Sequence, residues 1–164
     1  MLETSTLSAY FDVQHEKHAA VKSVVDSFDP YSPTYVSTIA LAELRFGAAL
    51  FELSGKPLPK WHTIISGAIA HVPLDITHHT SAEYAELKAN VAAKYLKNPR
   101  DKKERKRWIE NWVDKATGQI LGIDENDLWM CAQAREHNLV LVTTDKKIQR
   151  IADADAALRL WIIK

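Results

Sequence analysis

Short apolar runs alternate with longer segments of helical spacing along this 164-residue chain, and that alternation is what most restricts its fold. The clearest run, LVLVT, predicts a buried strand over 139–143. Shorter strands are expected at about 1–4, 34–37, 72–76 and 158–163. Helices are expected at about 15–28, 39–54, 59–70, 80–96, 108–121 and 125–136. Because strands that alternate with helices form mainly parallel sheets, the sequence predicts an α/β fold with a central sheet flanked by helices.

The expected helix boundaries follow from capping and helix-breaking residues. Thr38 and Asp124 each precede a helical segment and are expected to be N-caps. The segment 80–83, TSAE, matches a capping box, which leaves the two histidines before it in a loop. Gly55 and Pro57 are expected to end the helix over 39–54.

Charge and length restrict the class of protein. The 21 basic residues balance 21 acidic ones, which excludes a uniformly basic protein that coats nucleic acid. The length fits one domain over residues 1–164. A single cysteine, Cys131, excludes an internal disulfide and is expected to be a buried structural thiol. With no signal-peptide pattern and no run of about 18 apolar residues, we expect a cytoplasmic protein that does not enter membranes.

Four carboxylates fall where the expected strands end or the following helices begin. These residues are Glu3, Glu43, Asp127 and Asp145. Because sites in α/β folds form beyond the carboxyl ends of the strands, the four are expected on one rim of the sheet. Clustered carboxylates without basic partners favour Mg²⁺ or Mn²⁺, which prefer oxygen ligands. The alternative from pattern alone is that they serve as N-caps and surface groups.

The segments around these carboxylates resemble a known family. They are LETSTLS at 2–8, LAELRFGA at 41–48, ENDLWMCAQA at 125–134 and LVTTD at 141–145. In this order, with one acid each, they are similar to the four motif blocks of PIN-domain ribonucleases, above all the VapC-like toxins of bacterial toxin–antitoxin pairs. The resemblance covers about residues 1–96 and 119–162.

The resemblance implies a PIN-like three-layer sandwich and a metal-dependent endoribonuclease that uses Mg²⁺ or Mn²⁺. It assigns catalysis and metal binding to Glu3, Glu43, Asp127 and Asp145. Thr143 or Thr144 could add a hydroxyl to the metal or phosphate surroundings, and Thr144 is taken as an RNA-binding candidate. The expected partners are an RNA substrate, a small antitoxin that neutralises the toxin, and a second copy of the chain.

Two substitutions in the first motif keep an alternative open. The family usually carries Asp where this chain has Glu3, and Asn where it has Ser5. The alternative is a degenerate PIN module that binds RNA or a protein partner without cutting. An unrelated flavodoxin-like binding domain is a third hypothesis, but the five glycines include no phosphate-binding glycine loop.

One basic stretch stands out from the rest of the sequence. Residues 94–115 carry a local excess of five positive charges. The same stretch contains Trp108 and Trp112. Basic residues beside aromatic rings could bind a single strand, so Arg105, Lys106 and Arg107 are RNA-binding candidates. The alternative is a solvated helix whose tryptophans face the core or a partner. The stretch is expected to be a basic helical elaboration of the domain at about 98–118.

Overall fold

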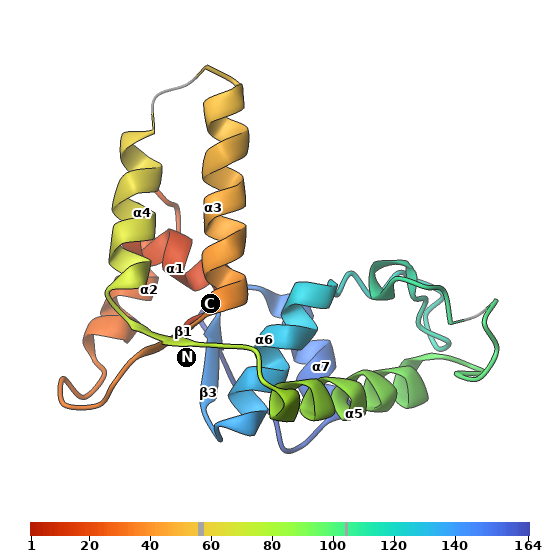
Figure 1. The fold of residues 1–164 in the computed structure, drawn as a ribbon. Helices are drawn as coiled ribbons and strands as arrows, with labels where there is room; N and C mark the ends of the chain where they lie inside the picture. Colours follow the sequence, from red (N-terminus) through yellow and green to blue (C-terminus); the bar gives the residue numbers. More distant parts are fainter. Residues whose placement is uncertain (56–57, 104) are drawn as a thin grey trace. The chain divides into compact units, whose positions relative to one another are not determined.

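The structure is a computed structural model that describes residues 1–55, 58–103 and 105–164 (Figure 1). The expected helix end at Pro57 lies outside the described residues, and so does Glu104, one of the acidic residues in the basic stretch 94–115. The chain divides into two compact units. Unit 1 comprises Met1–Asp75, Leu141–Thr144 and Trp161–Lys164, and unit 2 comprises Ile76–Val140 and Asp145–Leu160. The organisation as a single domain stays a prediction.

Unit 1 holds the parallel sheet that the sequence predicts. Its elements are α1 (Thr4–Phe11), α2 (His18–Asp26), β1 (Tyr35–Ser37), α3 (Thr38–Leu53), α4 (Pro59–Ile69), β2 (Val72–Leu74), most of β3 (Val140–Thr143) and the second half of β4 (Arg159–Ile162). Strand β1 pairs with β2 in parallel, and β3 pairs with β4. Leu2 makes parallel bridges to Val36 of β1 and Val142 of β3. The predicted α/β class is therefore confirmed, but the predicted first strand is reduced to Leu2, because α1 begins at Thr4.

Helices α3 and α4 of unit 1 lie side by side (Figure 1). Their close approach depends on glycine: a Cβ at Gly47 of α3 would lie 2.6 Å from the ring of Trp61 of α4. A Cβ at Gly67 of α4 would lie 2.3 Å from the ring of Phe11 of α1. Helix α3 starts one residue earlier than predicted, because Ser37 rather than Thr38 is the N-cap and accepts a hydrogen bond from the backbone N–H of Ile39.

Unit 2 is built around α5 (His78–Tyr95), which packs against α6 (Glu125–Glu136) and α7 (Gln149–Ala154). Two short 3₁₀ turns, η1 (Ile109–Asn111) and η2 (Lys146–Ile148), complete the unit. Its core contains fully buried aliphatic and aromatic side chains together with a buried thiol: Leu87, Val91, Ile109, Trp112, Leu128, Met130, Cys131, Ile148 and Ile151. The prediction that Cys131 is buried is confirmed.

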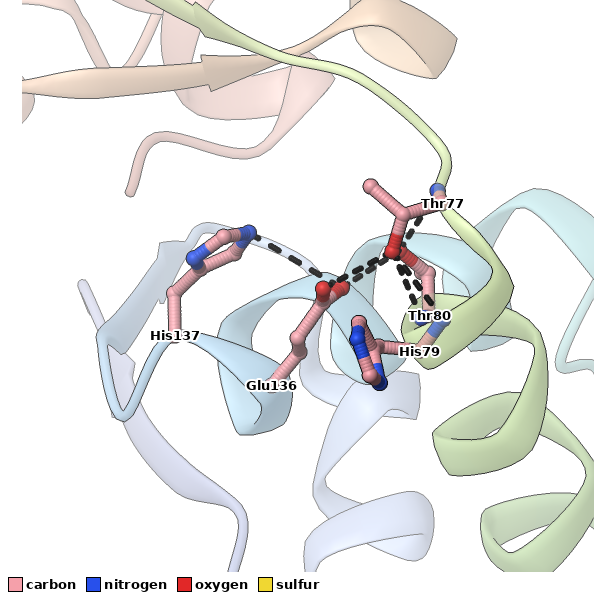
Figure 2. Close-up of polar contacts among 5 residues, drawn as sticks. All are labelled: Thr77, His79, Thr80, Glu136 and His137. Carbon is pink, nitrogen blue, oxygen red and sulfur yellow. Dashed lines mark hydrogen bonds and ion pairs between the residues drawn. The ribbon is translucent and has the colours of Figure 1, made fainter.

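A hydrogen-bonded cluster joins the start of α5 to the end of α6 (Figure 2). The N-cap of α5 is Thr77, which forms a capping box with Thr80. The carboxylate of Glu136 in α6 accepts hydrogen bonds from the hydroxyls of both residues. The hydrogen bond from the Thr77 hydroxyl is 2.9 Å long. The capping box predicted at 80–83 was wrong by three residues, because Thr80 acts as the third helical residue rather than as the cap. His78 and His79 therefore lie in the first turn of α5 instead of a loop.

Burial alone would raise the pKa of Glu136, but the hydrogen bonds from Thr80 and Thr77 outweigh it. The net effect is a lowered pKa, to which His137 and His79 also contribute. The Nε2 atom of His137 lies 3.8 Å from the carboxylate of Glu136. The carboxylate therefore stabilises this helix junction in its charged form.

The described residues of the segment 98–118 form no α-helix, so the predicted helix over 108–121 was wrong. Among its described residues only η1 has a helical turn, and Val113 forms an antiparallel bridge with Ile120. Asp114 starts a turn by accepting hydrogen bonds from the backbone of Ala116 and the hydroxyl of Thr117. Gly118 then adopts a positive φ of 71°. This local turn chemistry competes with helix formation and prevails over the apolar spacing.

No helix within the described residues is long and apolar enough to cross a membrane.

Candidate functional site

Glu3 is the most enclosed of the four predicted carboxylates. Its side chain is 5% exposed and caps α1 by accepting a hydrogen bond from the backbone N–H of Ser5, at 2.9 Å. The hydroxyl of Ser5 donates to the same carboxylate, and that of Thr143 donates to it over 2.9 Å. Burial raises the pKa of Glu3, these donors lower it, and the charge of Glu43 adds to the rise, so that the pKa stays above its ordinary value.

Glu43 lies on α3 in the same unit. It is partly buried, and its carboxylate accepts a 2.5 Å hydrogen bond from the hydroxyl of Thr4. Adjacent hydroxyl residues at the start of α1 therefore serve two carboxylates: Thr4 donates to Glu43 and Ser5 to Glu3. Unit 1 thus brings these two predicted site residues near each other.

A second layer of polar contacts fixes the hydroxyls themselves. The Thr144 hydroxyl donates to the Ser5 hydroxyl over 2.8 Å. The ammonium of Lys17 donates to the carbonyl oxygen of Thr144 over 3.2 Å and brings a positive charge to this side of unit 1. Thr144 is only 6% exposed, and its predicted contact with RNA stays a prediction.

The sequence reasoning did not identify Thr4, Ser5 or Lys17 as parts of the site. A signal for the first two was present, because three consecutive hydroxyl residues follow Glu3. Ser5 stands where the family usually has Asn, and it still provides both a hydroxyl and a backbone donor to Glu3. Lys17 had no local signal, because the contact that brings it to Thr144 spans 127 residues.

Asp127 and Asp145 belong to unit 2. Asp127 is 8% exposed and forms a capping box with Asp124: its carboxylate accepts from the N–H of Asp124 over 3.1 Å, and Asp124 accepts from the N–H of Asp127 over 2.8 Å. The predicted N-cap role of Asp124 is confirmed. Asp145 caps η2 by accepting from the N–H of Lys147, and one peptide bond joins it to Thr144.

The four-carboxylate cluster itself stays a prediction. Within the described ranges, no group of three or more His, Cys, Asp or Glu side chains is positioned to hold a metal ion. The chemistry at Glu3 nevertheless fits a hard divalent cation. Its buried carboxylate receives only hydroxyl and backbone donors, and no described basic side chain forms an ion pair with it. Carboxylate oxygens in such surroundings are the ligands that Mg²⁺ and Mn²⁺ prefer.

The predicted RNA-binding residues Arg105, Lys106 and Arg107 line a cavity of about 740 Å³ in unit 2. All three are exposed. The guanidinium of Arg107 lies over the Trp108 ring, 4.7 Å from its centre. The two tryptophans of this stretch differ: Trp108 is 50% exposed, whereas Trp112 is buried, and its indole N–H donates to the carbonyl of Lys106 over 2.8 Å.

Parallel strands, flanking helices and a buried carboxylate at the first helix define an α/β protein with a candidate cation site. The sequence matches the family described as PIN domain over residues 1–154, and the chain therefore belongs to the PIN domain family. The match spans residues of both compact units. No curated protein matches the chain.

Several solved structures share this fold. The chain is 20% identical to a chain of VapBC2 from Rickettsia felis bound to a DNA fragment from their promoter, with a TM-score of 0.65 over 100% of this chain and 98% of that one. It is 21% identical to a chain of VapBC-1 from nontypeable Haemophilus influenzae, with a TM-score of 0.62 and 99% and 96% coverage. The match to FitAcB from Neisseria gonorrhoeae has 22% identity, a TM-score of 0.56 and 98% and 94% coverage.

Proposed function

We propose that this PIN-domain protein is a metal-dependent endoribonuclease in which Glu3, Glu43, Asp127 and Asp145 hold Mg²⁺ or Mn²⁺. PIN domains are typically nucleases. The observation that carries the proposal is the buried carboxylate of Glu3, which is held by hydroxyls and has no basic counter-charge among the described residues. A buried carboxylate without a cation is costly, and a bound divalent ion would offset that cost.

Each residue has a defined part in this mechanism. Ser5 and Thr143 hold the carboxylate of Glu3 in one orientation, and Thr4 does the same for Glu43. Asp127 and Asp145 complete the negative charge of the site, and the carboxylate that does not touch metal orients the attacking water. A bound ion supplies polarisation of a phosphoryl oxygen and a more acidic water. Lys17, whose ammonium donates to the carbonyl oxygen of Thr144, would supply a positive charge for the RNA phosphate.

The proposal is tested by incubating the full chain and end-labelled single-stranded RNA with Mg²⁺, with Mn²⁺ or with a chelator. We expect cleavage with either ion and none with the chelator. Asp127→Asn should abolish cleavage without loss of fold, because the amide oxygen can still accept the hydrogen bond from the N–H of Asp124. Glu43→Gln should do the same, whereas Glu52→Gln, an exposed acid on the same helix, should leave the rate unchanged. Wild-type cleavage by the Asp127→Asn variant would contradict the assignment.

We also propose that the protein is the VapC-like toxin of a toxin–antitoxin pair, acts in the cytoplasm and forms a homodimer. Its structural neighbours are the VapBC and FitAcB assemblies. Helix α3 also exposes three large apolar side chains at helical spacing, Phe46, Leu50 and Leu53, which are 65%, 51% and 84% exposed. Apolar residues on one exposed helix face favour contact with a protein partner. Co-expression with the product of the neighbouring gene, followed by co-purification, tests this proposal.

One feature favours the alternative of a PIN module that binds without cutting. Glu3 has a longer side chain than the usual Asp, and its oxygens already accept hydrogen bonds from Ser5 and Thr143. Metal-independent RNA binding with no cleavage under any of the three conditions would support this alternative. Activity retained by Glu3→Asp would oppose it.

A further inference from the structure

The cavity of unit 2 combines an apolar wall with a positively charged rim. Its volume is about 740 Å³, which lies in the range of small-molecule sites. One wall is the face of α5 that carries Ala85, Ala89 and Ala92, spaced so that they share a side of the helix. Pro99, which is partly exposed, and Trp112, which is buried, also line the cavity. Because the alanines are small, the wall is hollowed where longer side chains would fill it.

The single charge on this wall is already neutralised. Lys88 forms an ion pair with Glu125 and donates to the hydroxyl of Tyr84 over 2.8 Å. Its ammonium lies 5.9 Å from the centre of the Trp112 ring. The wall therefore presents largely aliphatic surface rather than net charge.

The rim carries five exposed cations, all within 99–107: Arg100, Lys102, Arg105, Lys106 and Arg107. None of them forms an ion pair with a carboxylate of the described residues. Asp101, the described acidic residue within this stretch, uses its carboxylate to accept a 2.8 Å hydrogen bond from the backbone N–H of Lys103. The rim is therefore complementary to a group with several negative charges.

We infer that this cavity binds an unpaired base of single-stranded RNA, with the flanking phosphates on the cationic rim. The flat ring face of a base, with phosphates on either side of the nucleotide, matches an apolar wall with a cationic rim. A paired base is stacked in its helix and cannot enter, so the cavity selects unpaired RNA. This inference rests on the proposed ribonuclease function for the identity of the nucleic acid, and it names a substrate-binding subsite separate from the carboxylates.

The test measures binding in the presence of a chelator, so that cleavage plays no part. A fluorescently labelled single-stranded RNA of ten nucleotides is titrated with the full chain, and its anisotropy is followed at several salt concentrations. Ala89→Leu fills the hollow in the cavity wall without changing any charge. It should weaken RNA binding about fivefold or more, while the slope of log affinity against log salt stays unchanged. Ala82→Leu, at another exposed alanine of α5 outside the cavity, is the matched control and should bind like the wild type.

The rim is tested separately by the double variant Arg100→Ala and Arg105→Ala. It should flatten the slope of log affinity against log salt by about 1.4, which is about 0.7 for each phosphate that the variant no longer neutralises. A duplex RNA of equal length should be insensitive to Ala89→Leu. Melting curves that match the wild type establish that each variant is folded.

The outcomes separate this inference from the proposed function. Binding that depends on Ala89 without any cleavage in Mg²⁺ or Mn²⁺ supports the subsite and contradicts the ribonuclease. Equal binding by the wild type and Ala89→Leu overturns the subsite, whatever the cleavage result. Displacement of the RNA by a ten-residue polyglutamate as effectively as by unlabelled RNA would also overturn it, since the rim would then be a site for acidic peptides.

Discussion

Arg135 of α6 is the centre of an ionic network within unit 2, and its replacement gives a stability prediction that can be worked out from the structure. Its guanidinium lies 2.7 Å from Glu83, 2.8 Å from Glu86 and 2.6 Å from Asp155. The Arg135 side chain is 13% exposed and that of Asp155 is 6% exposed, whereas that of Glu86 is 61% exposed. The three pairs therefore differ in their energetic weight.

The largest contribution comes from the buried pair. Removing one partner of a buried ion pair costs about 3–5 kcal/mol, whereas an exposed pair contributes about 0–1 kcal/mol. Asp155 would keep its hydrogen bonds from Asn90 and from the N–H of Ala157, both 2.9 Å, which places the cost near the lower limit. Arg135→Met, which retains the apolar stem, should therefore lower the free energy of unfolding by about 3 kcal/mol. For a chain of this length that corresponds to about 6–12 °C in Tm.

The measurement is urea denaturation at pH 7, followed by far-UV circular dichroism. Glu86→Gln is the matched control and should cost about 0.5 kcal/mol or less, because its pair is exposed. The double variant Arg135→Met and Asp155→Asn should lose at least about 1 kcal/mol less than the sum of the single variants, because the two residues interact directly. A loss below about 1 kcal/mol for Arg135→Met, or strict additivity in the double variant, would refute the reasoning.

Three further predictions concern other parts of the chain. Folding lowers the pKa of Glu136 below its ordinary value of 4.5, so its contribution to stability is complete above pH 4.5 and is lost as the pH falls through the folded pKa. Glu136→Gln should therefore make the free energy of unfolding less dependent on pH below about 4.5, as measured by urea titrations at several pH values. In thermal melts, Gly67→Ala should destabilise unit 1 by up to about 2 kcal/mol, because the Phe11 ring must move and the better helix propensity of alanine offsets only part of that cost. The control Ser66→Ala replaces an exposed residue and should not destabilise unit 1. Ser5→Ala should reduce metal-dependent cleavage of labelled RNA, because the Glu3 carboxylate loses one of its two hydroxyl donors and keeps only that of Thr143; an unchanged rate at every Mg²⁺ concentration would exclude that role.

The parts of the fold that the sequence predicts well depend on local chemistry. The strand over 139–143 is an uninterrupted apolar run, and the structure has β3 at Val140–Thr143. Asp124 caps α6 as predicted, because the capping box is complete within four residues. The error at 108–121 is also local: Trp108 and Trp112 have helical spacing, but Asp114 and Gly118 form a turn that ends any helix there.

The candidate site was only partly predictable, because its supporting contacts join distant segments. The carboxylates could be selected from their position after strands and at helix starts. The hydroxyl of Thr143 reaches Glu3 across 140 residues, and no spacing rule indicates that pair. The same holds for Lys17 and the carbonyl of Thr144. Sequence patterns thus select the carboxylates by residue type and by their position at strand ends and helix starts. The donors that orient these carboxylates depend on tertiary packing and cannot be found in this way.

The bridges made by Leu2 have a consequence for the order in which the protein matures during synthesis. The N–H of Glu3 donates to the carbonyl of Val142, and the N–H of Val142 donates to that of Met1. Residues 1–3 must therefore wait until residue 142 has been made before they find these partners, and long-range pairings of this kind form late. The carboxylate at residue 3 receives its Thr143 donor only after residue 143 has been made. A nascent chain that stops before residue 143 therefore lacks a donor that orients this carboxylate, and the candidate site is assembled only after that residue has been made.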